Sequence, residues 1–252
     1  GFEKGKQGIF STFSAFLEMI VSEATMARLN DANVICHFSH AGVDDMADNT
    51  CHFGINIFLA HSGIPEGDKT RLYFAADALQ LKAIVERIWN DEGIRYVFTT
   101  RSKVPYILKE DGGKFFGEGY VFTPGKDDVI REGTAGYVVS YGEMLYRALD
   151  AVERARAQGV HVGLVNKPTL NVCDGEMLAQ VGKTPFVLVV EGQNRVNGLG
   201  VRYGTCLLKN GYAPKYDFMG VTVPGDGGIA EQLPNQRLEP EHILAKILEM
   251  AG

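Results

Sequence analysis

Cysteine is scarce in this 252-residue chain and occurs only at Cys36, Cys51, Cys173 and Cys206. No C-x-x-C pair is present, so no disulfide-dense framework is indicated. Two of the four lie in apolar strand or helix patterns, where a free thiol behaves as a small hydrophobe. A reducing compartment therefore fits best, and we expect a cytoplasmic enzyme or part of one.

The chain also lacks a basic excess and a long apolar run. Its formal net charge of -6 argues against a nucleic-acid partner, which normally requires a basic face. No apolar run approaches the roughly 20 residues that span a bilayer, and the start shows no signal-like pattern. With 45% hydrophobic and 22% charged residues, the composition is that of a globular protein without a nucleic-acid or membrane partner.

What the sequence does contain is an alternation of strand-like and helical patterns. Apolar strands are predicted at residues 9–13, 34–39, 73–76 and 96–100, and again at 136–141, 160–165, 186–190 and 216–223. Helical patterns separate them, which predicts an α/β fold with mainly parallel sheets flanked by helices. Turn-rich segments near residues 110–114 and 123–128 suggest a connection. We expect two domains, residues 1–112 and 132–252, joined by a linker at 113–131.

One loop gathers two histidines and three aspartates. Residues 40–53, HAGVDDMADNTCHF, directly follow a predicted strand, and open α/β sheets place their chemistry at strand carboxyl ends. Three interpretations stay open. The loop is a polar surface loop, a Zn²⁺ or Fe²⁺ site, or a pocket in which His40, Asp48 and His52 bind a polar substrate. The spacing matches no recognised metal signature, so we assign no metal ligand.

Two further groups lie at predicted strand ends. Phe13 and Phe16, in the segment STFSAF, lie three apart at a strand-to-helix junction and face the same way. They either pack in the core or form a platform for a planar ring. Arg101 follows the strand at 97–100, and is either a solvated surface residue or a fork for phosphate or carboxylate.

The order of these groups resembles the transketolase family of thiamine diphosphate enzymes across essentially the whole chain. Residues 11–16 match its pattern S/A-T-F-x-x-F, and residues 39–53 align without a gap with T-H-D-S-I-G-x-G-E-D-G-P-T-H-Q. Further matches are FAAD at 74–77 to R-P-x-D, TTRS at 99–102 to L-S-R-Q, and the segments VSYG at 139–142, KPTL at 167–170 and EGQN at 191–194. The first domain is thus similar to the family's pyrimidine-binding (Pyr) domain, and the second to its C-terminal domain.

The resemblance implies a role for each candidate residue. Phe13 and Phe16 would contact the aminopyrimidine of thiamine diphosphate, and His40 and Arg101 would bind substrate phosphate. His52 and Asp48 would be the catalytic residues, at the reacting carbonyl and at a substrate hydroxyl. The implied reaction moves a two-carbon ketol unit between sugars, usually phosphorylated, and the cofactor supplies the carbanion chemistry.

Three departures from the family pattern affect this interpretation. Met19 replaces a usual third aromatic, and residues 49–51, NTC, replace G-P-T, so substrate preference is open. The family's catalytic glutamate lies upstream of the S-T-F strand, where this chain begins too late to contain it, and neither Glu3 nor Glu18 is at its position. The segment GDG at 225–227 matches a loop before the last helix, not the G-D-G metal motif.

The resemblance also predicts a partner. Thiamine diphosphate binds between a Pyr domain and a diphosphate-binding domain, normally from different subunits, and the latter mainly binds Mg²⁺. We expect the C-terminal half of a split or longer transketolase-like enzyme, acting on a sugar phosphate. It would assemble with an N-terminal diphosphate-binding domain or subunit, as a homodimer or heterotetramer. A 1-deoxyxylulose-5-phosphate synthase-like activity and a non-catalytic assembly partner are the alternatives.

Overall fold

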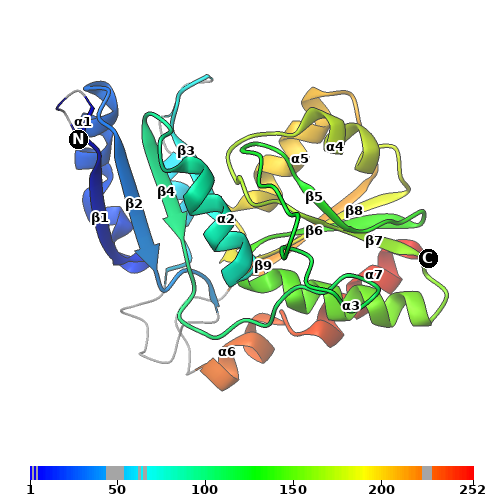
Figure 1. The fold of residues 1–252 in the computed structure, drawn as a ribbon. Helices are drawn as coiled ribbons and strands as arrows, with labels where there is room; N and C mark the ends of the chain where they lie inside the picture. The colour runs from blue at the N-terminus through cyan, green and yellow to red at the C-terminus, as the bar shows by residue number, and fades with distance from the viewer. Residues whose placement is uncertain (2, 4, 44–53, 62–63, 65–66, 223–228) are drawn as a thin grey trace.

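The fold is taken from a computed structural model, which describes residues 1–252 except 2, 4, 44–53, 62–63, 65–66 and 223–228. Two sheets lie next to each other, each with helices packed against it, and the N- and C-termini lie at opposite sides of the molecule (Figure 1). Within the described residues, no helix is both long and apolar enough to cross a membrane.

The first sheet contains, among the described residues, four parallel strands in the order β1-β2-β4-β3. They are β1 (Gly8–Phe13), β2 (Val34–Ser39), β3 (Arg71–Phe74) and β4 (Ile94–Phe98). The accompanying helices are the 3₁₀ helices η1 (Ser14–Ile20) and η4 (Ile57–His61) and the α-helices α1 (Val21–Leu29) and α2 (Ala78–Ile88). Asp77 caps α2 by accepting the backbone N–H groups of Leu79 and Gln80, both at 2.9 Å.

The second sheet has the order β5-β7-β6-β8-β9, and only β5 is antiparallel among its described strands. Its strands are β5 (Asp128–Arg131), β6 (Gly136–Ser140), β7 (Val162–Asn166), β8 (Phe186–Asn194) and β9 (Lys215–Val221). Figure 1 shows α4 and α5 on one face of this sheet and α3 and α7 on the other. The helices are η5 (Gly142–Met144), α3 (Leu145–Ala157), α4 (Gly175–Val181), α5 (Leu199–Lys209), α6 (Ile229–Gln236) and α7 (Pro240–Ala251).

The predicted α/β class, with two mainly parallel sheets flanked by helices, is confirmed. The central strands β6 and β7 are buried along their whole length, because helices cover both faces of the sheet. Strand β5 lies within the segment that we predicted as a linker, and it pairs with β7. The sequence also has an apolar stretch around residues 55–60, and the structure forms the 3₁₀ helix η4 there. Periodicity alone does not distinguish a strand from a helix in so short a run.

The two sheets are joined through the edge strand β3. The backbone N–H of Leu170 donates to the carbonyl of Leu72 at 2.8 Å, and that of Phe74 donates to the carbonyl of Pro168 at 3.0 Å. Tyr73 and Thr169 form an antiparallel bridge between these bonds. The segment after β7 therefore covers the open edge of the first sheet and pairs the two halves of the chain there.

Candidate functional site

The carboxyl ends of β1, β2 and β4 meet at one edge of the first sheet. Phe13 ends β1, His40 follows β2, and Arg101 follows β4 and is exposed. The backbone N–H of Ala41 donates to the carbonyl of Thr99 at 3.0 Å. Parallel pairing therefore brings the segments that carry Phe13, His40 and Arg101 to the same edge, as the sequence predicts.

Phe13 and His40 are in direct contact. Their ring centroids lie 4.3 Å apart in an edge-to-face arrangement, and the Phe13 and Phe16 centroids lie 6.0 Å apart. Phe16 keeps 37% of its surface exposed. His40 has a φ of 59°, a left-handed conformation that costs a non-glycine residue energy and occurs mostly at functional sites and turns. Its Nδ1 lies 2.9 Å from the Ser39 hydroxyl, which orients the ring.

The predicted catalytic residues Asp48 and His52 lie outside the described residues. The described residues on either side of that segment meet, because the N–H of Gly42 donates to the carbonyl of Gly54 at 3.0 Å. A Cβ on Gly54 would lie 2.6 Å from the His40 carbonyl oxygen, so Gly54 packs directly against the His40 backbone. The described flanks Gly42 and Gly54 therefore lie beside the Phe13–His40 contact.

His37 is a residue of this edge that sequence reasoning missed. Its Nδ1 lies 2.8 Å from the Ser11 hydroxyl and its Nε2 lies 3.0 Å from the Thr99 hydroxyl. Burial lowers the pKa of His37, which favours the neutral ring that can donate with one nitrogen and accept with the other. It therefore ties β1, β2 and the end of β4 together. In the sequence, His37 could have been identified as a polar residue inside an otherwise apolar strand.

Glu143 connects this edge to the second half of the chain. It belongs to η5 and is only 1% exposed. A Cβ on Gly42 would lie 1.8 Å from Glu143 Oε1, and one on Gly192 would lie 2.0 Å from the same atom. The carboxyl group therefore occupies the space that two glycines leave open, one from each half of the chain.

Gly42→Ala is expected to destabilise the protein by about 2 kcal/mol or more, because a methyl group collides with the buried Glu143 carboxyl. Gly42 also has a φ of 92°. Gly112→Ala is the matched control, since Gly112 has a φ of 84° with nothing within 4 Å of the added Cβ. Urea unfolding measures both variants. Equal losses in the two would show that backbone strain, and not the Glu143 contact, sets the cost.

A second buried carboxyl group, Glu191, anchors α5. It accepts the Tyr141 hydroxyl at 2.8 Å and the backbone N–H groups of Leu199 at 2.7 Å and Gly200 at 2.9 Å. The last two belong to the first turn of α5, whose positive dipole end favours an acceptor. Burial nevertheless outweighs these donors and raises the pKa of Glu191 to about 7.

We expect this raised pKa to make stability depend on pH near neutrality. Because the folded pKa of about 7 exceeds the ordinary 4.5, the native state binds more protons between these values, and stability falls as pH rises. From pH 5 to pH 8, the wild type should lose about 2 to 3 kcal/mol more than Glu191→Gln. Urea unfolding across this range tests it. Parallel pH curves for the two proteins would contradict the prediction.

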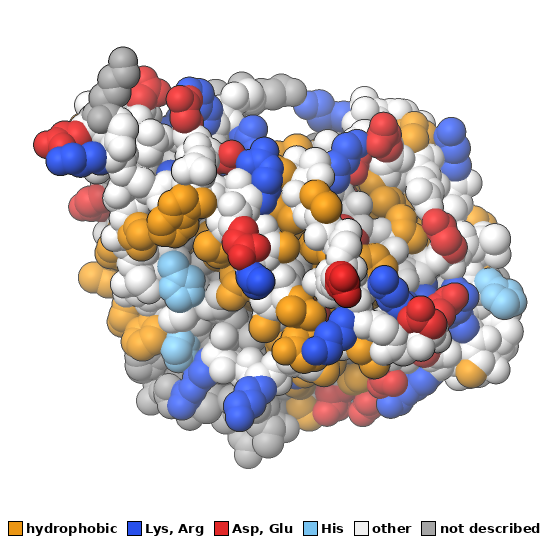
Figure 2. All heavy atoms as spheres, viewed as in Figure 1, with side chains coloured by type: hydrophobic (Ala, Val, Ile, Leu, Met, Phe, Trp, Pro, Cys, Tyr) orange, Lys and Arg blue, Asp and Glu red, His pale blue; other side chains and the backbone are white. Residues whose placement is uncertain are grey.

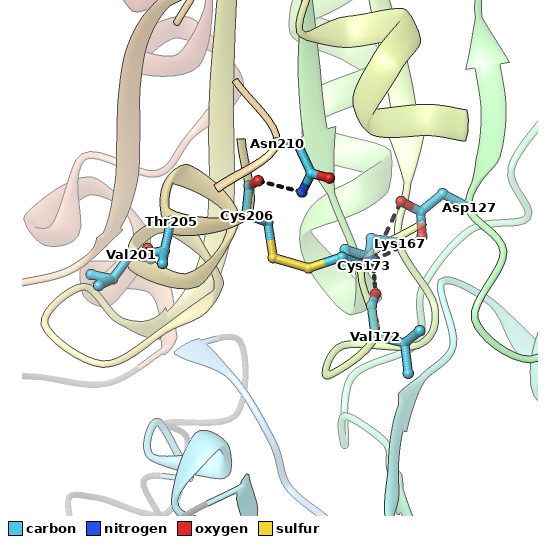
Figure 3. The surroundings of a disulfide bond; sticks show 8 residues. All are labelled: Asp127, Lys167, Val172, Cys173, Val201, Thr205, Cys206 and Asn210. Carbon is cyan, nitrogen blue, oxygen red and sulfur yellow. Dashed lines mark hydrogen bonds and ion pairs between the residues drawn. A yellow bond between two sulfur atoms is a disulfide. The ribbon is translucent and has the colours of Figure 1, made fainter. Parts of the chain in front are cut away.

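The second half also contains a disulfide, which the sequence analysis did not predict. Cys173 and Cys206 are bonded across 33 positions, with their Cα atoms 6.6 Å apart. Figure 3 shows that the bond links the segment after β7 to α5, next to Lys167. The Lys167 ammonium donates to Asp127 Oδ1 at 3.0 Å and to the Val172 carbonyl at 2.6 Å. The predicted cytoplasmic location stays an expectation.

Comparison with known proteins identifies the second half. Residues 125–243 match the family model of the transketolase C-terminal domain. This half of the chain belongs to the transketolase C-terminal domain family. The chain is 31% identical over 140 residues to an uncharacterised transketolase family protein of Sinorhizobium fredii. This match covers 55% of the present chain and 39% of the relative. It is also 23% identical to transketolase-like protein 2 of Mus musculus over 94% of this chain and 37% of the relative.

Two further transketolase relatives are subunits or split forms by description. One of the subunits of the apulose-4-phosphate transketolase of Actinobacillus succinogenes is 28% identical over 60% of this chain and 45% of its own. A solved split gene transketolase, described as an inactive beta4 tetramer, has a TM-score of 0.80 and 25% identity, over 96% of this chain and 76% of that one. The present chain spans less than half the length of the curated relatives named above.

Proposed function

We propose that this chain is the C-terminal half of a transketolase-like enzyme that transfers a two-carbon ketol unit between sugar phosphates. The contact of Phe13 with His40 at the carboxyl ends of the first sheet carries the proposal. The order of Phe13, Phe16, His40 and Arg101 along the chain and their common edge support it. In this proposal residues 1–112 form the Pyr domain, 113–131 the linker and 132–252 the C-terminal domain.

The residues at this edge fit an aminopyrimidine. Phe16 keeps more than a third of its surface exposed beside Phe13, so an aromatic face is open to a planar ring. Thiamine diphosphate, when bound, would supply the carbanion chemistry. Phe13 and Phe16 orient the ring and exclude water from it. Mg²⁺ would be bound mainly by the partner's diphosphate-binding domain.

The polar residues take the sugar in this proposal. His40 and Arg101 bind the substrate phosphate, because a guanidinium and an imidazole both donate to phosphate oxygens. His52 lies at the reacting carbonyl, where it can hold or move a proton, and Asp48 accepts a substrate hydroxyl. The described flanks of the loop, Gly42 and Gly54, pair with each other next to His40.

An exposed apolar surface supports a partner subunit. The residues of β1, η1 and α1 expose large apolar side chains, namely Ile9 at 64%, Phe10 at 39%, Met19 at 74%, Met26 at 57% and Leu29 at 67%. In Figure 2 hydrophobic side chains gather on the side where β1 and β2 lie in Figure 1. Patches of this kind mark interaction sites. We assign it to an N-terminal diphosphate-binding subunit, in a homodimer or heterotetramer.

Calorimetric titration tests the function. Thiamine diphosphate with Mg²⁺ is titrated into this chain and into its complex with a diphosphate-binding transketolase subunit, after sedimentation has verified the complex. We expect binding and ketol transfer only in the complex, and Phe13→Leu to weaken binding at least about 5-fold by loss of ring contact. Trp89→Leu, an exposed aromatic at the end of α2, is the matched control. A verified complex without cofactor binding would indicate a non-catalytic assembly partner.

A further inference from the structure

A groove of about 900 Å³ separates η4 and β3 of the first half from α5 and the segment after β7 in the second. It lies on the β3 side of the first sheet, whereas Phe13 ends the opposite edge strand, β1. Its volume is that of a small-molecule site. Phe13, Phe16, His40 and Arg101 are not among the described residues that line it.

Positive charge dominates the walls of this groove. Four basic side chains and one acidic one line it, and these are Arg71, Lys167, Arg202, Lys209 and Asp68. Two of these charges are compensated by salt bridges. Lys167 Nζ lies 3.0 Å from Asp127 Oδ1, and Arg28 Nη1 lies 3.4 Å from Asp68 Oδ2. The excess therefore lies at Arg71 and Lys209, and in part at Arg202, whose guanidinium also interacts with the buried Glu191 carboxyl group. Such an excess attracts an anion.

Four of the lining residues carry buried polar atoms that lack a hydrogen-bond partner in the part of the chain that the structure describes. They are His61 Nδ1, Asn197 Oδ1, Arg202 Nε and the Tyr203 hydroxyl. Tyr203 is only 2% exposed. A buried donor or acceptor without a partner is unfavourable and requires an explanation. All four residues belong to the lining of one groove, which points to a ligand there as the missing partner.

The apolar part of the groove wall indicates which class of ligand fits. Leu170, Val196 and Val201 line the groove between the polar groups, so a ligand with a carbon skeleton is favoured over a bare ion. The Cys173–Cys206 disulfide lies in the wall and holds its two sides together within the second half. The Arg202 guanidinium lies over the Phe58 ring, 5.3 Å from its centroid, a contact that favours this position of the side chain.

We propose that this groove binds a small phosphorylated organic anion, with the phosphate at Arg202 and the Tyr203 hydroxyl. The site is separate from the proposed sugar-phosphate site and does not depend on it. Phosphate takes several charge-assisted hydrogen bonds from guanidinium and hydroxyl donors. Asn197 Oδ1 and His61 Nδ1 are then available to hydrogen-bond hydroxyl groups on the carbon skeleton of the ligand.

Titration calorimetry at low salt with glycerol 3-phosphate tests the proposal, with glycerol as the uncharged control. We expect a Kd below about 1 mM, at least a 10-fold loss in Arg202→Gln and at least a 3-fold loss in Tyr203→Phe. The latter variant removes a hydroxyl that has no partner among the described residues, so the fold is retained. Tyr106→Phe, an exposed tyrosine outside the groove, should bind like the wild type.

Three outcomes would overturn the proposal. One is equal binding of glycerol 3-phosphate to the wild type, Arg202→Gln and Tyr203→Phe. Another is a heat of glycerol 3-phosphate binding that is lost in Arg101→Gln but retained in Arg202→Gln. That result would place the ligand at the proposed sugar-phosphate site. The third is a wild type that binds glycerol 3-phosphate no more strongly than glycerol.

Discussion

Replacing Asp127 by alanine is expected to lower the free energy of unfolding by about 3 to 5 kcal/mol, because it leaves the Lys167 ammonium buried without its counter-charge. The Lys167 side chain is 2% exposed and that of Asp127 1% exposed, with Nζ and Oδ1 3.0 Å apart. After the substitution, the ammonium keeps its hydrogen bond to the Val172 carbonyl, which carries no full charge. Urea unfolding followed by circular dichroism measures the loss.

The double variant Asp127→Ala with Lys167→Met separates the buried charge from the rest of the effect. An apolar side chain of similar length needs no counter-charge, so most of the stability should return. Glu92→Ala breaks the exposed pair of Lys69 and Glu92, whose side chains are 63% and 68% exposed, and should cost far less stability than Asp127→Ala because water screens the pair. A loss in Glu92→Ala as large as that in Asp127→Ala would refute this explanation.

Removing the disulfide is the other change with a large expected effect. Cys173 and Cys206 close a loop with a sequence separation of 33, and the chain-entropy relation for that length gives about 4 kcal/mol. The double variant Cys173→Ser with Cys206→Ser should therefore unfold at a clearly lower urea concentration than the oxidised wild type. The reason is that the open chain has more freedom when unfolded.

The wild type in excess dithiothreitol is the control for this experiment. It should unfold at the same urea concentration as the serine double variant, because both lack the bond. Alkylation and mass measurement establish which thiols are free. Among the described residues, Cys36 is the free cysteine, and it is buried. If the oxidised wild type and the variant unfold together while the mass shows an intact bond, the predicted contribution is wrong.

The sequence predicted the fold class because that information is local. Strands and helices differ in the period of their apolar residues, 2 against 3.6, and the chain alternates between the two patterns. The same apolar periods predict where strands end, so the sequence predicts Phe13, His40 and Arg101 at strand carboxyl ends. Their roles in binding stay proposals, as do those of Asp48 and His52.

Contacts between residues that lie far apart in the chain became known only from the tertiary structure. Ser11 and Thr99 reach His37 from two other segments, Glu143 fills the space beside Gly42, and Cys173 bonds to Cys206. No local pattern marks such pairs, because each depends on how distant segments pack together. Short segments such as η4 were also ambiguous, since their conformation depends on what they pack against.

The sequence alone thus determined the alternation of strands and helices, the strand ends that carry Phe13, His40 and Arg101, and the family that the chain resembles. Only the tertiary structure decided that the segment after β7 covers the edge of β3, and that a basic groove lies between the two halves. The physical reason is that burial follows from local periodicity, whereas contacts between distant residues require the packed chain.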